Sequence, residues 1–446
     1  MSKKFVKLAP TAMFKMRYGK WYLIETQHQR KSRFRVGEET EKVLLSLFRG
    51  EEVSLVSSMF GFSDCELENF LSDLIDGGTV QWCNQPEDST DRCFEIDPPL
   101  DGVNVLLTNS CNLRCLHCYV SSGKKAPGEL NGEEWIRVLG EAQKLGAFEI
   151  NISGGEAMLH SDFEQVALFI ASMRTFNVNL NTNGVILDPR LEEIIPKAFS
   201  SVQVSIDNPN PEKHDKFRGR DGSFRRSISF IQRLVQKGVE TNISFTLTPE
   251  SIGFVDEMIR LGEELGISIL NIGLVANFGR ASENSIANQI NSRGDQNSGF
   301  LERVYLEVKR LKKINSTVEI LLPFRIPDRS ESLEPKKKEF ICGGDHTQLL
   351  YIMADGSLMP CDKLPINEFA CGNVRSSSLS EIWKSEKMKK FKLMNPVRLP
   401  KCKSCPQLSI CGGACVARAF HDGGSLESPD WTSCFIARRF SEDIPV

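Results

Sequence analysis

The sequence predicts an α/β protein in which a partial barrel of six β/α units lies between a small winged-helix-like domain and a cysteine-rich C-terminal domain. Three observations lead to this fold class. The chain has 446 residues, a length typical of roughly two to four domains. Strand-like and amphipathic helical runs alternate through its centre. Eight of its 14 cysteines fall in the last 105 residues.

Composition narrows the functional class. The 55 Lys and Arg residues nearly balance 58 Asp and Glu residues, for a net charge of −3, so no general attraction to nucleic acid or anionic lipid is expected. No apolar run approaches the roughly 18–20 residues of a spanning helix. The N-terminal MSKKFVKLAP lacks a signal-peptide core, which favours a cytoplasmic location. In a reducing compartment, cysteines are better explained as metal ligands than as disulfides.

Residues 1–83 are predicted to form the first domain. Ala12–Arg17 and Trp21–Thr26 flank Tyr18-Gly19-Lys20 like a hairpin, and Arg33–Val36 alternates like a third strand. Three helical segments follow. The third begins at Ser63, with Glu66 completing a capping box, and ends at Gly77-Gly78. Residues 84–99 are polar and contain three prolines, so we expect a linker there.

The barrel is predicted over residues 100–320. Its strand-like runs lie near 103–108, 148–153, 177–182, 202–207, 240–247 and 267–274. Barrels of this kind carry their chemistry at the C-terminal ends of the strands. The polar stretch 282–298 is a candidate loop or lid, and 327–338 is a charged connection within the C-terminal domain, residues 321–446.

The first chemical motif follows the first barrel strand. Cys111, Cys115 and Cys118 form a CxxxCxxC pattern. Three thiolates at this spacing can converge on one iron-sulfur cluster and leave its fourth iron open, because such clusters normally take four cysteines. A zinc site with a distant fourth ligand, or buried thiols at helical spacing, would also fit the spacing.

This motif resembles that of the radical S-adenosylmethionine (SAM) enzymes, with His117 in the usual aromatic place. The resemblance implies a [4Fe-4S] cluster on the three cysteines, with SAM bound at the open iron and cleaved to a 5'-deoxyadenosyl radical. Later strand ends agree with the family. They carry the SAM-binding candidates Gly154, Gly155, Glu156, Asn183, Ser205, Asp207 and, beyond the fourth strand, Arg218.

The C-terminal cysteines resemble the SPASM domain, which carries two auxiliary [4Fe-4S] clusters in a subgroup of this family. The resemblance implies that auxiliary cluster I takes Cys342, Cys361 and Cys415, and that auxiliary cluster II takes Cys402, Cys405, Cys411 and Cys434. Cys371 is a candidate fourth ligand for cluster I. Spacing alone would also suit zinc, since zinc ribbons use CxxC pairs.

The N-terminal domain resembles the RiPP recognition element, a PqqD-like winged-helix domain that binds leader peptides of ribosomally made precursors. The resemblance places the leader beside the third strand and against the third helix, where the candidates are Arg33, Phe34, Arg35, Val36, Leu67, Phe70, Leu71 and Leu74. The basic residues of this strand could instead bind DNA, or form a solvated edge that prevents aggregation.

The combined resemblance is to radical SAM and SPASM peptide maturases, most of all the sactipeptide and ranthipeptide thioether synthases. It implies SAM, three [4Fe-4S] clusters, a precursor peptide and a reductant such as flavodoxin or ferredoxin. Three alternatives stay open: carbon-carbon cross-linking maturases, anaerobic sulfatase-maturating enzymes, and a non-catalytic metal-binding winged-helix regulator. The sequence names no catalytic base, and it does not identify the precursor peptide.

Overall fold

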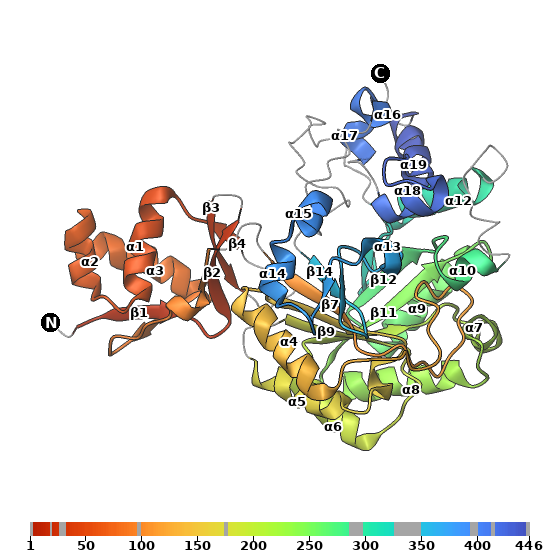
Figure 1. The fold of residues 1–446 in the computed structure, drawn as a ribbon, viewed down its shortest axis with the longest axis horizontal. Coiled ribbons are helices and arrows are strands. Elements are labelled where there is room, and N and C mark those ends of the chain that lie inside the picture. Colours follow the sequence, from red (N-terminus) through yellow and green to blue (C-terminus); the bar gives the residue numbers. More distant parts are fainter. Residues whose placement is uncertain are drawn as a thin grey trace.

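The computed structural model describes residues 3–17, 20–25, 33–95, 100–173, 177–284, 298–324, 349–392, 400–411 and 415–442. It has an N-terminal domain, a central α/β domain and a C-terminal group of short helices (Figure 1). Among these residues, no helix is both long enough and apolar enough to cross a membrane.

The N-terminal domain combines two small sheets with three helices. Its larger sheet has the order β4-β3-β2-β6, with bounds Arg33–Arg35, Lys20–Glu25, Ala12–Arg17 and Cys93–Phe94. The smaller sheet pairs β1 (Phe5–Leu8) with β5 (Val80–Cys83). The helices are α1 (Glu38–Phe48), α2 (Val53–Phe60) and α3 (Asp64–Asp76). The hairpin, the third strand and the capping box of Ser63 with Glu66 are confirmed.

Three strands of this domain had no counterpart in the prediction. They are β1, β5 and β6, and β6 lies inside the polar stretch predicted as a linker. There, Cys93 and Phe94 pair in parallel with Phe14 and Lys15 of β2. Arg92 donates to the carbonyl oxygen of Leu8 at 2.9 Å and also to that of Ala9. Arg92, Cys93 and Phe94 therefore belong to the N-terminal domain and not to a linker.

The central domain is built on a large, mostly parallel sheet, as predicted. The six expected strands lie side by side in chain order: β7 (Gly102–Leu106), β8 (Glu149–Ser153), β9 (Asn177–Thr182), β10 (Ser201–Ser205), β11 (Glu240–Leu247) and β12 (Ile269–Leu274). A further parallel strand, β13 (Glu319–Leu321), extends the sheet beyond β12. In the described residues, β13 and β16 occupy the two ends of the sheet, so it is open rather than closed.

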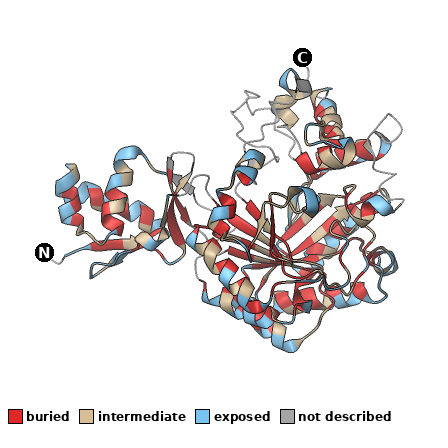
Figure 2. Ribbon diagram, viewed as in Figure 1, coloured by how far each residue is buried: buried red, intermediate tan, exposed pale blue. Residues whose placement is uncertain are grey.

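Helices connect these strands and cover the sheet. Their bounds are α4 (Gly132–Lys144), α5 (Phe163–Ser172), α6 (Pro189–Ala198), α7 (Pro211–Arg218), α8 (Ser223–Gln236), α9 (Val255–Leu265), α10 (Arg280–Glu283) and α12 (Ser298–Leu311). The strands and the inner helix faces are buried (Figure 2). Most of the candidate lid, 285–297, and the whole connection 327–338 lie outside the described residues.

The C-terminal region begins inside the same sheet. Strand β14 (Leu349–Ile352) pairs in parallel with β7, and β15 (Ser357–Met359) and β16 (Gly372–Asn373) continue it in antiparallel fashion. An open edge at β7 would leave unpaired backbone groups, and β14 covers them. The helices that follow are α13 (Ile366–Phe369), α14 (Leu379–Trp383), α15 (Glu386–Lys392), α16 (Pro400–Lys403), α17 (Leu408–Cys411), α18 (Val416–Gly423) and α19 (Trp431–Glu442).

Candidate functional site

The loop that carries Cys111, Cys115 and Cys118 leaves the C-terminal end of β7, where the sequence placed it. The three thiols pack together against Leu113 and Val185. Burial, with smaller contributions from Glu156 and the other two thiols, raises the pKa of the Cys111 thiol to about 11. The thiols therefore lie close enough to interact, and a bound cation would favour their thiolate forms.

The three thiols are the residues that would hold three corners of an iron-sulfur cluster. Within the described residues, no three His, Cys, Asp or Glu side chains are arranged to hold one metal ion. The assignment of the cluster to these thiols rests on their convergence and on the family pattern. When loaded, such a cluster with bound SAM supplies a carbon radical.

The segment after β12 holds the cluster loop by its backbone. Arg280 donates from Nε to the carbonyl oxygen of Cys115 at 2.9 Å and from Nη1 to that of Ser122 at 2.6 Å, while its backbone N–H donates to Cys118. Gly279 has φ +50°, and a Cβ there would lie 2.5 Å from the Cys118 carbonyl oxygen. Sequence reasoning missed this contact, because nothing in the sequence pairs residue 280 with the loop.

The Gly154-Gly155-Glu156 turn after β8 lies directly against the start of the loop. A Cβ at Gly154 would lie 2.6 Å from the carbonyl oxygen of Thr108, and one at Gly155 would collide with that of Ser110. Both positions therefore require glycine.

Glu156 is buried, and its carboxylate accepts from Thr182 Oγ1 and from the backbone N–H of Asn183, each at 2.8 Å. Burial raises the pKa of Glu156. Asn183 in turn donates to Asn112 of the cluster loop at 2.7 Å. These groups join the ends of β8 and β9 to the loop.

A buried charge network lies under the loop. Asp207, beyond β10, pairs with Arg218 at 2.6 Å and lies 3.8 Å from His117 Nε2. Burial alone would raise the pKa of Asp207, but the Arg218 guanidinium overrides this effect and lowers it. Arg218 also lies 3.6 Å from the Cys115 sulfur. Ser205 is half-buried at the end of β10.

Three buried polar atoms of this network have no hydrogen-bond partner among the described residues. One is Oδ2 of Asp207, which forms the ion pair with Arg218, and the other two are Nδ1 of His117 and Nε of Arg218. Buried donors of this kind normally have partners. His117 belongs to the cluster loop and Arg218 lies 3.6 Å from the Cys115 sulfur, so polar groups beside the thiols would suit a polar, partly anionic ligand such as SAM.

The four thiols assigned to auxiliary cluster II come together. Burial raises the pKa of Cys434 to about 12, with further contributions from Cys411, Cys402 and Cys405. Cys402 lies on α16, Cys405 follows this helix, Cys411 ends α17, and Cys434 lies on α19. A set of four thiols from three elements fits a fully ligated cluster.

The thiols assigned to auxiliary cluster I are only partly described. Cys361 and Cys415 belong to one buried group of side chains, and burial, the Asp362 carboxylate and, last, Cys415 raise the pKa of Cys361. Cys342 lies outside the described residues. Cys371 instead packs against the main core, and its sulfur lies 3.5 Å from the carbonyl oxygen of Phe369. Whether Cys371 ligates this cluster stays a prediction.

Asp430 is the centre of the C-terminal thiol region. Its side chain is 1% exposed and pairs with Arg418 at 2.8 Å. It also accepts from the backbone N–H of Cys415 at 3.0 Å, and its carbonyl oxygen accepts from that of Cys434 at 3.0 Å. One residue thus positions ligands of both auxiliary sets. Sequence reasoning did not identify it, since a single Asp in a polar turn carries no distinguishing signal.

The cluster loop and the auxiliary I region meet at Tyr119. Tyr119 follows Cys118 and bonds to Asp362, which follows Cys361. Burial, followed by the Asp362 carboxylate, raises the pKa of Tyr119. Lys363 pairs with Asp362 at 3.2 Å and lies 5.3 Å from the Tyr119 ring centre. Adjacent residues of two ligand loops are therefore in direct contact.

The leader-binding candidates divide into two groups. Leu67, Leu71 and Leu74 are buried in the core of the N-terminal domain, whereas Phe70 is half-buried. In β4, Arg35 is exposed, and Val36 follows the strand half-buried. The backbone of Arg33 and Phe34 pairs with β3.

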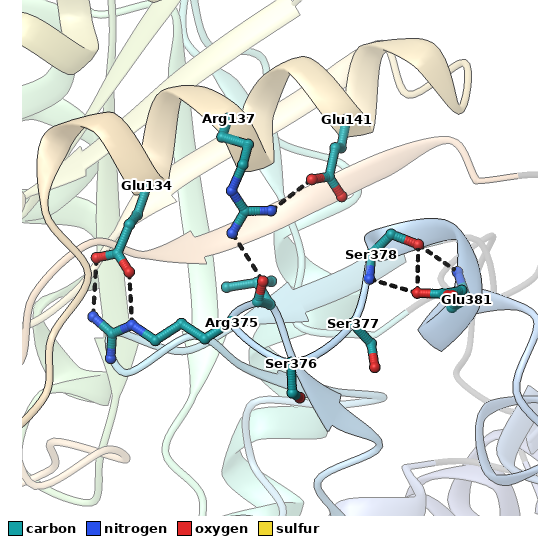
Figure 3. A pocket seen from close by; sticks show the side chains of 9 residues that line it. Glu134, Arg137, Glu141, Arg375, Ser376, Ser377, Ser378 and Glu381 are labelled. Carbon is teal, nitrogen blue, oxygen red and sulfur yellow. Dashed lines mark hydrogen bonds and ion pairs between the residues drawn. The ribbon is translucent and has the colours of Figure 1, made fainter.

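A surface hollow of about 480 Å³ lies between α4 and the segment before α14 (Figure 3). Its charged side chains are already paired. Arg375 bonds to Glu134 through both carboxylate oxygens, at 2.6 and 2.9 Å, and Arg137 pairs with Glu141 at 2.6 Å. We therefore interpret it as the contact of the C-terminal region with the central domain, not as a substrate site.

Comparison with known proteins agrees with this geometry. Residues 105–262 match the model of the radical SAM superfamily, and residues 342–406 match that of the SPASM iron-sulfur cluster-binding domain. The chain is a radical SAM enzyme that carries a SPASM domain, and the non-catalytic regulator is thereby excluded.

Three named proteins are similar to this chain in sequence. Mycofactocin maturase MftC of Mycolicibacterium smegmatis is 27% identical over 327 residues, 73% of this chain and 80% of the relative. Sporulation killing factor maturation protein SkfB of Bacillus subtilis is 30% identical over 62% of this chain, which spans 63% of that protein. An AdoMet-dependent heme synthase of Methanosarcina barkeri is 28% identical over 70% of this chain and 90% of the relative.

Among solved structures, the chain resembles Streptococcus suis SuiB bound to S-adenosylmethionine. The TM-score is 0.72, at 15% identity, over 96% of this chain and 99% of SuiB. SuiB bound to its precursor peptide SuiA gives a TM-score of 0.71 with similar coverage. At this identity the likeness concerns the fold.

Proposed function

We propose that the protein is a peptide maturase that modifies a ribosomally made precursor peptide. The observation that carries this proposal is the domain architecture: the likeness to SuiB extends over 96% of the chain, so it includes the N-terminal domain as well as the barrel. Two curated relatives, MftC and SkfB, are also maturation proteins by name. In this proposal the N-terminal domain holds the leader while the core peptide reaches the cluster loop.

The leader would add as a strand to the outer edge of β4. Among the described residues, β4 is the last strand of its sheet and pairs only with β3. Edge strands bind extended peptides through unpaired backbone groups, and neighbouring side chains give specificity. Arg35, Val36 and the half-buried Phe70 are the available candidates. Leu67, Leu71 and Leu74 would act indirectly, by holding α3 in place.

The reaction we favour is thioether formation with three [4Fe-4S] clusters. A hydrogen atom leaves a core-peptide carbon for the 5'-deoxyadenosyl radical, and the cysteine thiol loses a proton as its sulfur bonds to that carbon. One electron remains, and it would leave through the auxiliary clusters to an external acceptor. The contact of Tyr119 with Asp362 supports a short path between the two ligand loops.

A second candidate is a small-molecule enzyme. The heme synthase of Methanosarcina barkeri is as similar to this chain as the maturases are, at 28% identity. A tetrapyrrole substrate would require no leader-binding edge. Carbon-carbon cross-linking uses the same architecture as thioether formation, and the product separates the two.

The test is an anaerobic reaction with SAM, dithionite and the short peptide encoded beside the gene. We expect mass spectrometry to show the loss of two hydrogen atoms per bond and, after digestion, a cross-link from a Cys sulfur. A Cys111→Ser variant is the control and should leave the peptide intact. An intact peptide alongside abundant 5'-deoxyadenosine, together with turnover of a tetrapyrrole, would favour the second candidate.

A further inference from the structure

The larger sheet of the N-terminal domain is buried on both faces. Side chains at alternate positions, among them Phe14 of β2 and Leu23 of β3, pack against the helices of the domain. The intervening positions, Met13 and Ile24, pack with Phe148 of the central domain. Because strand side chains alternate between faces, one face of the sheet belongs to the domain and the other to the interface. Figure 1 shows this sheet between helices α1 to α3 and the central domain.

Lys15 lies in the middle of this interface and is fully buried. Its Nζ pairs with Asp101 at 3.1 Å, donates to the carbonyl oxygen of Gly146 at 2.8 Å and donates to that of Leu100. It also lies 5.6 Å from the ring centre of Phe148. A side chain of the N-terminal domain thus bonds to two separate loops of the central domain.

Phe94 of β6 completes the contact. It packs with Met13 and Ile24, and a Cβ on Gly146 would lie 2.6 Å from its ring. Gly146 has φ +75°, which also favours glycine. The two surfaces therefore fit closely at the point where Lys15 enters.

The interface lies at the opposite end of the sheet from the cluster loop. Leu100 and Asp101 precede β7, and Gly146 and Phe148 precede β8, whereas the cluster loop and the Gly154-Gly155 turn follow these strands. Five residues of parallel strand span roughly 17 Å. A peptide held by the N-terminal domain must cover at least this distance, which takes about five extended residues.

We propose that Lys15 holds the N-terminal domain in one position on the central domain and thereby fixes the distance between the bound leader and the cluster loop. Lys15 is a positioning residue, and this inference rests on the proposed function. The N-terminal domain is then attached rigidly to the central domain and not through a flexible tether. The residue of the precursor that is modified would be selected by its spacing from the leader.

The chemistry of the contact supports a positional role. A buried ion pair contributes little net stability compared with apolar packing, but a displaced sheet would leave the charges of Lys15 and Asp101 buried and uncompensated, which is strongly unfavourable. Apolar contacts between Met13, Ile24 and Phe148 would tolerate sliding of the sheet. Directional bonds from one ammonium group to Asp101, Gly146 and Leu100 do not.

The experiment compares Lys15→Met, the double variant Lys15→Met/Asp101→Asn and the control Lys7→Met. The double variant removes both charges, so it avoids the unpaired Asp101 that could unfold the single variant. Lys7 pairs with Glu87 at 2.7 Å inside the N-terminal domain and is the matched control. Hydrogen exchange, measured without any peptide, should rise at residues 100–106 and 145–150 in both Lys15 variants and stay unchanged at 111–123.

The second readout uses the precursor encoded beside the gene and a form with about four Gly and Ser residues inserted between leader and core, roughly 14 Å of added reach. The wild-type protein should modify the native precursor at set positions and should fail to modify the peptide that carries the insertion. The double variant should bind the leader with unchanged affinity, cleave SAM normally, and show an about tenfold lower ratio of main to displaced products.

Two results would contradict the proposed role of Lys15. One is unchanged exchange at 100–106 and 145–150 in the double variant, and the other is a product pattern as spacing-dependent as that of wild type. Failure of the proposed function gives a different result: wild type would neither bind nor modify the peptide, while the exchange difference between Lys15→Met and Lys7→Met would persist.

Discussion

The two cysteine-bearing regions are organised differently. The cluster loop of the central domain is held by backbone hydrogen bonds from two neighbouring segments: Phe217 and Arg218 accept from the loop, and Arg280 donates to it. Of the auxiliary thiols, Cys402 and Cys411 lie on α16 and α17, helices of four residues each, and Cys415 and Cys434 are bonded to one buried residue, Asp430. The first site is built on the core of the sheet, whereas the second is built on a smaller group of buried side chains and on short helices.

This difference indicates where metal is needed for folding. A metal site whose ligands come from distant segments rarely exists before the metal binds. Cys361, Cys415 and Cys434 come from separate elements, while the cluster loop follows a buried strand. We therefore expect the barrel to keep its fold without iron and the C-terminal helices to lose theirs.

Removal of iron tests the comparison directly and has the largest expected effect. In protein purified with a chelator, hydrogen exchange should approach that of an unfolded chain over residues 400–411 and 415–442 and change little in β8 to β11. Reloaded protein serves as the control and should regain protection. Equal protection of both regions in the iron-free protein would contradict this account.

Asp430→Asn should have the next largest effect. It leaves Arg418 without its partner, and breaking a buried ion pair costs about 3–5 kcal/mol. We expect the lower end, because Arg418 keeps 25% of its side chain exposed. Iron analysis should show loss of the auxiliary clusters, while the electron paramagnetic resonance signal of the SAM cluster remains.

Glu427→Gln, at an exposed position in the preceding turn, is the matched control for this variant. It should retain all iron. Loss of the SAM-cluster signal in Asp430→Asn, with the auxiliary clusters intact, would show that we have assigned Asp430 to the wrong region.

Arg280→Met should weaken the cluster loop to a smaller degree. It removes two hydrogen bonds from a charged donor, each worth about 1.5–3 kcal/mol before the loop relaxes. We expect a broadened resonance signal of the SAM cluster and several-fold slower SAM cleavage, with the auxiliary clusters unaffected. Arg260→Met, on the exposed face of α9, should match wild type; an unaltered signal in Arg280→Met would show that the loop is held without it.

Arg375→Ala should have the smallest effect. The hydrogen bond from Arg375 lowers the pKa of Glu134 to about 2, so the pair stabilises the fold above the ordinary value near 4.5 and loses this contribution as the pH falls toward 2. Its worth is at most about 1 kcal/mol, because the pair is partly exposed and screened. Melting curves between these pH values should show the difference narrowing in acid, and Arg190→Ala is the control, since Arg190 pairs only at the surface with Asp188.

Local signals accounted for much of the structure. The six barrel strands, the capping box of Ser63 and the convergence of Cys111, Cys115 and Cys118 follow from residues close together in the chain. Strands β1, β6 and β14 did not follow, because each is only two to four residues long and forms by pairing with a distant strand. Short strands carry no periodicity that a sequence can reveal.

The sequence likewise does not show which charged side chains are buried by a distant part of the chain. Lys15 reads as an ordinary polar position in an alternating hairpin, although it is the most deeply buried charge of its domain that the structure describes. The alternation is the same whether the second face of a sheet meets water or another domain, so it cannot distinguish the two.

The sequence alone determined the chemistry of this protein, because thiolate spacing and glycine placement are local requirements of the cofactor loop. Only the tertiary structure decided which distant groups support that chemistry. Arg280, Asp430 and Lys15 act across domains or between remote loops, where partners are brought together by the packing of the sheet and not by their order in the chain.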